Sequence, residues 1–139
     1  MVICKEDNLF IIKIFKEYLN NVDIFDKDSI VSLFKDILFR LKKRYDLCGL
    51  FDIKVYTNDD YGMIMEVNNI YKYDDEIDVK INFNIDSVFL YEVQEEDDCR
   101  GSIYYYDGKY YSDYVDGNYD SSVIYKDSLD IIRKGIRIK

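Results

Sequence analysis

The segment DKDSIVSLFKDILFRLKKRYDLCG, residues 26–49, decides the fold, because its apolar residues recur at the helical spacing of three and four. Asp26 to Ser29 supply capping residues before this pattern, and Gly49 follows its last turn. Basic side chains in the last turns complement the negative end of a helix dipole. The sequence therefore predicts a long helix from Asp26 to Cys48, with an apolar face formed by Ile30, Val31, Phe34, Ile37, Leu38, Leu41 and Tyr45.

The chain before this helix predicts a β-hairpin. Two apolar runs, Val2 to Cys4 and Leu9 to Phe15, are separated by the polar tripeptide Glu6-Asp7-Asn8. The alternative is that the second run begins a helix that reaches Leu19.

The chain after the helix predicts strands, because the apolar period changes from helical spacing to two. Alternation is clear in residues 51–55 and 77–83, and further strands are expected at Gly62 to Val67 and Val88 to Val93. We expect these segments to form two antiparallel pairs in a four-stranded sheet under the helix.

The last third of the chain predicts a tyrosine-rich hairpin. Residues 102–106 and 109–114 flank Asp107-Gly108, which is a strong signal for a tight hairpin turn. Ser128 to Lys134 predicts a short helix, followed by a strand at Ile136 to Ile138. The fold class is therefore α+β: a mostly antiparallel sheet packed on one long helix, with the hairpin extending one sheet edge and a short C-terminal helix. No linker divides the sequence, so we expect a single domain over residues 1–139.

The acidic side chains are distributed unevenly along the chain. Residues 52–120 hold 18 of the 28 acidic side chains and five of the 19 basic ones. The negative electrostatic field of this region favours a cationic partner and disfavours nucleic acid or an anionic membrane as a ligand. We therefore expect a basic protein partner, with no direct binding of nucleic acid or membrane.

Two features of composition bear on the excess of aspartate. The chain has no Ala, Pro, His or Trp and is rich in Ile, Asn, Lys and Tyr, which indicates an AT-rich genome. Codon bias does not explain 21 Asp against seven Glu, since both have codons of the same base composition. Because aspartate bonds its own neighbouring backbone in turns and caps, we expect part of the excess to reflect loop structure.

Cysteine usage predicts a cytoplasmic protein. Cys4, Cys48 and Cys99 are odd in number and far apart, so they indicate reduced thiols rather than a disulfide framework. Charges interrupt the apolar start of the chain, so we expect no signal peptide. No segment approaches the ~20 apolar residues that span a bilayer.

The inventory of reactive residues argues against an enzyme. Without histidine, Ser-His and Cys-His nucleophile pairs and imidazole zinc sites are excluded. No phosphate-binding glycine motif and no GxSxG motif occurs, and the abundant carboxylates show no spacing that selects a catalytic pair. We expect no cofactor and no catalytic residues, and no motif is specific enough to assign a family.

One loop offers a metal-binding alternative. Asp116, Asn118 and Asp120 place oxygen ligands at positions one, three and five of an EF-hand-like loop, with Asp127 at position twelve. Ser121 stands where the EF-hand turn requires glycine, and the flanking residues do not predict helices. We expect no resident metal, and a carboxylate-based Ca²⁺ or Mg²⁺ module or enzyme remains an alternative function.

The leading hypothesis for function is a partner surface on the tyrosine-rich hairpin. Residues 104–125 hold eight of the 15 tyrosines among several aspartates, and tyrosine and carboxylate together are typical of recognition surfaces. We expect a non-enzymatic inhibitor or regulator, of the immunity-protein or nucleic-acid-mimic type, that engages its partner through Tyr105, Asp107, Tyr110, Asp113, Tyr114, Asp116 and Asp120.

Another alternative is a self-associating structural or regulatory subunit. The basic helix end at Arg40 and residues 42–44 is the main basic cluster of the chain. If it meets the acidic region of a second copy, a head-to-tail homo-oligomer would follow.

Overall fold

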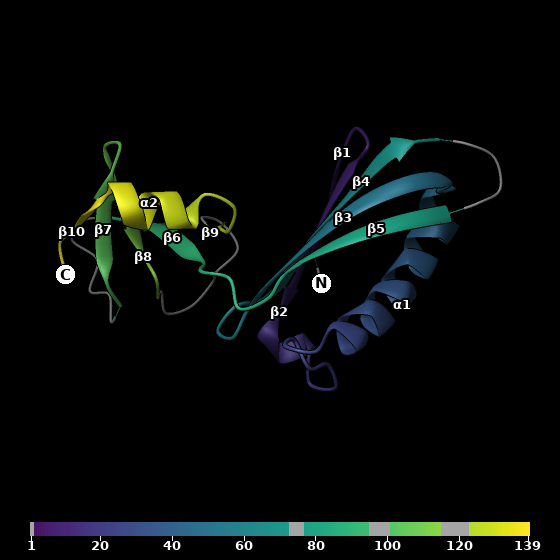
Figure 1. Cartoon of the computed structure of the whole chain (residues 1–139), viewed down its shortest axis with the longest axis horizontal. Helices are drawn as coiled ribbons and strands as arrows, with labels where there is room; N and C mark the ends of the chain where they lie inside the picture. The colour runs from purple at the N-terminus through teal and green to yellow at the C-terminus, as the bar shows by residue number, and fades with distance from the viewer. Residues whose placement is uncertain (1, 73–76, 95–100, 115–122) are drawn as a thin grey trace. The chain divides into compact units, whose positions relative to one another are not determined.

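The computed structural model of the chain describes residues 2–72, 77–94, 101–114 and 123–139. It divides into two compact units, Met1–Asp86 (unit 1) and Ser87–Lys139 (unit 2), and each contains one sheet (Figure 1). Mostly antiparallel strands together with one long and one short helix confirm the α+β class. The single domain remains a prediction.

Unit 1 contains a five-stranded sheet in the order β1-β2-β4-β3-β5. Neighbouring strands are antiparallel except β3 and β5, which are parallel. The predicted N-terminal hairpin is confirmed, and a single 3₁₀ turn at Lys16–Tyr18 follows its second strand. The strands are β1 (Val2–Glu6), β2 (Leu9–Phe15), β3 (Gly49–Asn58), β4 (Gly62–Tyr71) and β5 (Ile77–Asn84).

The predicted long helix is confirmed as α1 (Lys27–Tyr45). Asp26 caps its start, where the side chain accepts a hydrogen bond from the Asp28 amide at 3.2 Å. The helix ends earlier than predicted because Asp46 adopts the left-handed conformation, with φ 52°, and its amide bonds the Lys42 carbonyl. Gly49 therefore opens β3 instead of capping the helix.

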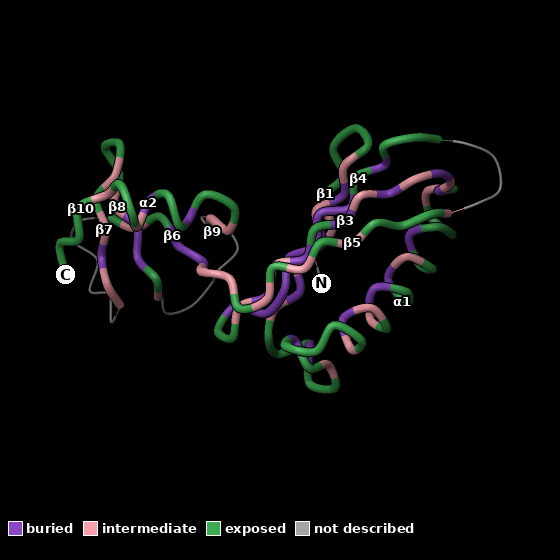
Figure 2. The backbone as a smooth tube through the Cα atoms, in the orientation of Figure 1, coloured by how far each residue is buried: buried purple, intermediate pink, exposed green. Residues whose placement is uncertain are grey.

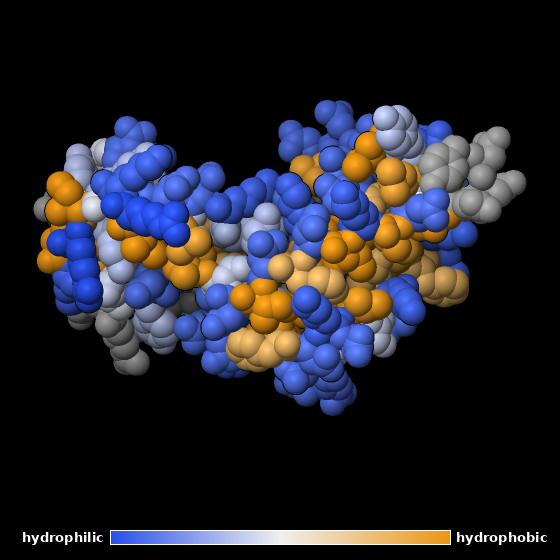
Figure 3. Space-filling view, viewed as in Figure 1, coloured by the Kyte–Doolittle hydropathy of each residue, from blue (hydrophilic) through white to orange (hydrophobic). Residues whose placement is uncertain are grey.

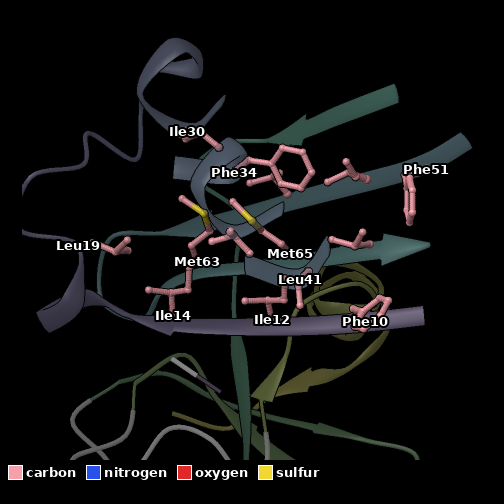
Figure 4. Close-up of a cluster of buried hydrophobic side chains, with 14 of the residues drawn as sticks. Phe10, Ile12, Ile14, Leu19, Ile30, Phe34, Leu41, Phe51, Met63 and Met65 are labelled. Carbon is pink, nitrogen blue, oxygen red and sulfur yellow. The ribbon is translucent and has the colours of Figure 1, made fainter. Parts of the chain in front are cut away.

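The core of unit 1 lies between α1 and one face of the sheet (Figure 4). Buried residues on α1 recur every three or four positions, while those on β2 alternate with less buried ones (Figure 2). Full burial of each such side chain contributes about 1.5–3 kcal/mol. The contacting side chains include Ile30, Phe34, Ile37 and Leu41 of α1, Phe10, Ile12 and Ile14 of β2, Phe51, Ile53 and Val55 of β3, and Met63, Met65 and Val67 of β4.

The predicted pairing of the third and fourth sheet strands is wrong. β5 does not pair with the strand that follows it but lies parallel to β3, with Gly49 opposite Ile77. The end of β4, at Tyr71, already lies opposite Leu50 at the start of β3. β5 therefore begins at the same end of β3 at which β4 ends.

Unit 2 contains a second five-stranded sheet in the order β10-β7-β8-β6-β9. The tyrosine-rich hairpin is confirmed as β7 and β8, but it belongs to this second sheet and does not extend the sheet under α1. The strands are β6 (Leu90–Val93), β7 (Ile103–Tyr106), β8 (Lys109–Ser112), β9 (Val123–Ile124) and β10 (Ile136–Arg137).

The predicted short helix is confirmed as α2 (Ser128–Lys134), which covers one face of the unit 2 sheet. Its Ile131 packs with Leu90 of β6 and Tyr111 of β8 in a small buried cluster. The Ser128 hydroxyl donates a hydrogen bond to the Val88 carbonyl and so ties the start of the helix to the chain before β6. The opposite face of the sheet does not pack on α2.

Two phenylalanines of α1 provide a matched test of the core. Phe34 is 2% exposed and Phe39 is 61% exposed. We expect Phe34→Ala to lower the free energy of unfolding by about 3–5 kcal/mol, because it leaves a cavity in the core. Phe39→Ala should cost less than ~1 kcal/mol, mainly through the lost contact with the Lys43 ammonium 4.3 Å from its ring centroid. Urea denaturation followed by circular dichroism measures both, and equal losses would contradict the packing.

Gly49 makes the turn from α1 into β3 sterically demanding. Its φ is +102°, and a Cβ added there would lie 1.8 Å from the Tyr71 carbonyl oxygen. We expect Gly49→Ala to lower the free energy of unfolding by on the order of 3 kcal/mol. Alanine is strained at this positive φ, and its Cβ would overpack against the backbone at Tyr71. The control is Gly108→Ala, where φ is +79° but no atom lies within 4 Å, so only the conformational cost of about 1–2 kcal/mol applies. A larger loss at Gly108 would contradict the close approach.

Candidate functional site

The tip of the tyrosine-rich hairpin is a tight two-residue turn. Asp107 has φ 50° and Gly108 has φ 79°, the positive pair that a type I′ turn requires. The turn sets the register of β7 and β8, in which Tyr106 lies opposite Lys109 and Tyr105 opposite Tyr110. Asp107 is exposed at the end of the hairpin.

Because side chains alternate along each strand, the tyrosines of the hairpin lie on both faces of the sheet. Tyr104, Tyr106 and Tyr111 lie on the face that packs with α2. Tyr105 and Tyr110 lie on the other face, where their ring centroids are 5.1 Å apart at an interplanar angle of 55°. This geometry is favourable for an aromatic pair, and Tyr105 keeps 38% of its surface exposed.

Apolar side chains extend this tyrosine pair on both sides. In the sheet register Ile136 of β10 lies opposite Tyr105, and Val93 of β6 lies opposite Tyr110. Ile136 is 67% exposed, and Val93 is partly buried. We call these four residues (Ile136, Tyr105, Tyr110, Val93) the tyrosine row. A contiguous exposed patch, unlike an isolated apolar residue, is typical of an interaction site.

The sequence did not indicate Ile136 and Val93 as members of this surface. Ile136 reaches it through a two-residue strand that pairs with β7 across about thirty residues of sequence. Hydrophobic alternation in residues 136–138 was the available signal, but it does not reveal which strand is the neighbour. The structure therefore adds two apolar residues to the predicted pair of tyrosines.

The predicted acidic residues have different roles in the structure. Asp107 is exposed, whereas the Asp113 carboxylate accepts a hydrogen bond from the Ser102 amide at 2.8 Å. Tyr114 is partly buried and follows β8, with its backbone bonded to the Ser112 hydroxyl. Asp116 and Asp120 lie outside the described residues. Of the predicted surface, the structure therefore brings together Tyr105 and Tyr110, with Asp107 at the end of the same hairpin.

The basic side chains of the unit 2 strands lie away from the tyrosine row. Lys109 lies on the α2 face, where it forms an ion pair with Glu92 at 3.8 Å. Arg137 lies opposite Tyr104 on that same face, and its guanidinium donates to the Ser102 hydroxyl at 3.1 Å. Among the described strand residues of unit 2, none on the face of the tyrosine row is Lys or Arg.

The negative charge is shared between the two units. Unit 1 has 17 acidic and 12 basic residues, a net charge of -5, and unit 2 has 11 acidic and seven basic residues, a net charge of -4. The acidic stretch 52–120 thus crosses the boundary between the units. Figure 3 shows that, on the face in view, hydrophobic residues reach the surface among hydrophilic ones in both units.

No family model, curated protein or solved structure matches this chain.

Three further features of the described residues concern metal binding and membrane spans. These residues contain no group of three or more cysteine or acidic side chains placed to hold a metal ion. Asp116, Asn118 and Asp120 of the EF-hand-like loop lie outside them, while Asp127 precedes α2 without a capping bond from its side chain. Neither described helix is long and apolar enough to cross a membrane.

The hydrogen bond that the Ser102 amide donates to the Asp113 carboxylate can be tested by amide hydrogen exchange. We expect Asp113→Ala to accelerate exchange of the Ser102 amide about fivefold, because loss of one hydrogen bond costs about 1 kcal/mol. Asp113→Asn keeps an oxygen acceptor and should leave the Ser102 exchange rate near that of the unmodified protein. Equal exchange in all three proteins would show that the carboxylate does not hold this strand end.

Proposed function

We propose that the protein is a non-enzymatic binding protein whose tyrosine row docks against a basic protein partner. The observation that carries the proposal is the aromatic pair of exposed Tyr105 and partly buried Tyr110, flanked by Ile136 and Val93. Tyrosines held in place by strand pairing offer a rigid contact surface with polar ends, which is typical of binding hot spots.

Charge supports a basic partner over an acidic one. The net charge of the chain is -9 and that of unit 2 is -4, while the described strand residues on this face carry no charge of either sign, so none of them repels a cationic partner. Electrostatic attraction raises association rates by roughly 10 to 10³ fold and makes them dependent on salt. Covering the basic surface of a partner is how an inhibitor or regulator of the immunity-protein or nucleic-acid-mimic type would act.

We further propose that the protein works in a reducing compartment such as the cytoplasm. Cys4 and Cys48 are free thiols, and Cys4 is exposed. An exposed free thiol is typical of proteins kept in reducing conditions.

The proposal predicts that Tyr105→Ala/Tyr110→Ala binds its partner about tenfold or more weakly, because truncated anchors lose most of their contact energy. The measurement is affinity capture from a lysate of the source organism at low and high salt, followed by titration of the captured protein. Tyr18→Ala is the matched control, because Tyr18 is 65% exposed but lies in unit 1. Asp107→Asn should keep the affinity at high salt and reduce the salt dependence.

Two outcomes would overturn this function. The first is a captured protein that binds the double tyrosine variant as tightly as it binds the unmodified chain. The second is recovery of the bait alone at both salt concentrations, together with sedimentation that shows self-association, which would favour the oligomeric subunit.

A further inference from the structure

Unit 1 contains a small pocket at the C-terminal end of α1. Its volume is about 180 Å³, and it is lined by the β1–β2 turn, the end of α1 with the loop that follows, and the end of β4. Ligand sites for drug-sized molecules measure roughly 300–1,000 Å³, so this pocket fits a smaller metabolite. It is independent of the tyrosine row, which lies in unit 2.

Asn69 lines this pocket and carries a buried acceptor without a partner in the part of the chain that the structure describes. Its side chain is nine-tenths buried, with the residue 7% exposed. The backbone amide donates to the Asn8 carbonyl at 2.9 Å, and the side-chain Nδ2 donates to the Cys48 carbonyl at 3.3 Å. These bonds fix the orientation of the amide, yet Oδ1 is buried without a partner among the described residues. A buried acceptor in this state is stabilised by a ligand that donates an N–H or O–H.

Charges of both signs surround the same pocket. Lys5 and Lys72 contribute ammonium groups, and Asp7 and Asp46 contribute carboxylates. None of the four forms an ion pair with another described residue. Asp46 also lies at the C-terminal end of α1, where the helix dipole favours a positive group.

Aromatic rings form the apolar wall. Phe10 and Tyr45 pack edge to face with centroids 5.0 Å apart. The Lys5 ammonium lies 5.8 Å from the Phe10 centroid and 5.9 Å from the Tyr45 centroid. The pocket lining therefore combines aromatic rings, a buried acceptor and charged side chains of both signs.

We propose that this pocket binds a small zwitterion that carries an amine and a carboxylate, the chemistry of a free α-amino acid. The amine would donate to Asn69 Oδ1 and lie near the carboxylates of Asp7 and Asp46. The carboxylate would pair with the ammonium groups of Lys5 and Lys72. A simple anion leaves Asn69 Oδ1 without a donor, and a simple amine leaves both lysines without an anion.

The test is a titration of the whole chain with each common L-amino acid, followed by NMR of the Asn69 side-chain amide. At least one amino acid should saturate the signal at millimolar concentration, on the order of 10 mM or below. Its two half-molecules should bind about tenfold more weakly; for L-valine they are isobutylamine and isovalerate. A half-molecule that binds as well as the amino acid, or no saturable binding at all, would overturn the proposal.

Variants assign the binding to this pocket. Asp7→Asn/Asp46→Asn removes both carboxylates at positions with φ 51° and 52°, a conformation that asparagine also tolerates. We expect this variant to bind the amino acid about tenfold more weakly. The control is Asp86→Asn, the same change at φ 56° outside the pocket, which should bind normally. Lys72→Gln tests the other charge, and unchanged binding in both pocket variants would overturn the assignment.

Discussion

The structure of unit 1 depends on the packing of one helical face against alternate residues of three strands. Phe34 and Leu41 of α1 can be buried only if the strands present apolar side chains on the same side. A one-residue slip of β2 would turn Phe10, Ile12 and Ile14 away from the helix, so the packing also fixes the register. The end of α1 is set in the same way, because Asp46 must break the helix before Gly49 passes Tyr71.

In the proposed function, the tyrosine row and the carboxylates of unit 2 would contribute differently to recognition. Strand pairing holds Tyr105 and Tyr110 in position before any partner arrives, so little side-chain freedom is lost on binding. Asp113 already bonds the Ser102 amide and has a structural role. Under the proposal, the general negative charge would favour association, whereas the rings would provide the shape that a specific partner recognises.

Local patterns predicted most elements but not their arrangement. Helical spacing predicted α1, the Asp107-Gly108 turn predicted the β7–β8 hairpin, and period-two alternation predicted β3 and β5. The division into two sheets was missed, because alternation shows which face of a strand is buried and not which strand is its neighbour. The tyrosine pair could be predicted because both tyrosines lie in one hairpin. Ile136 could not be predicted as their neighbour, because it joins them by pairing between strands far apart in the sequence.

In unit 1, the place of Asn69 in a pocket could likewise not be predicted from local sequence patterns. Nothing in its neighbourhood in the sequence distinguishes it from Asn68, yet its burial and its bonds to Asn8 and Cys48 place it in a pocket. Contacts between residues far apart in the chain define that site, so a single sequence carries no local signal for it.

The aspartates at turns have a consequence for how copies of the chain meet in solution. Among the described residues, all non-glycine positions with positive φ are aspartate: Asp7, Asp46, Asp86 and Asp107. Each of these four turns thus also places a negative charge next to the end of a strand or helix. Because these turns occur in both units, each unit carries exposed negative charge that disfavours the close approach of a second copy. The geometry of the turns thereby contributes to colloidal stability.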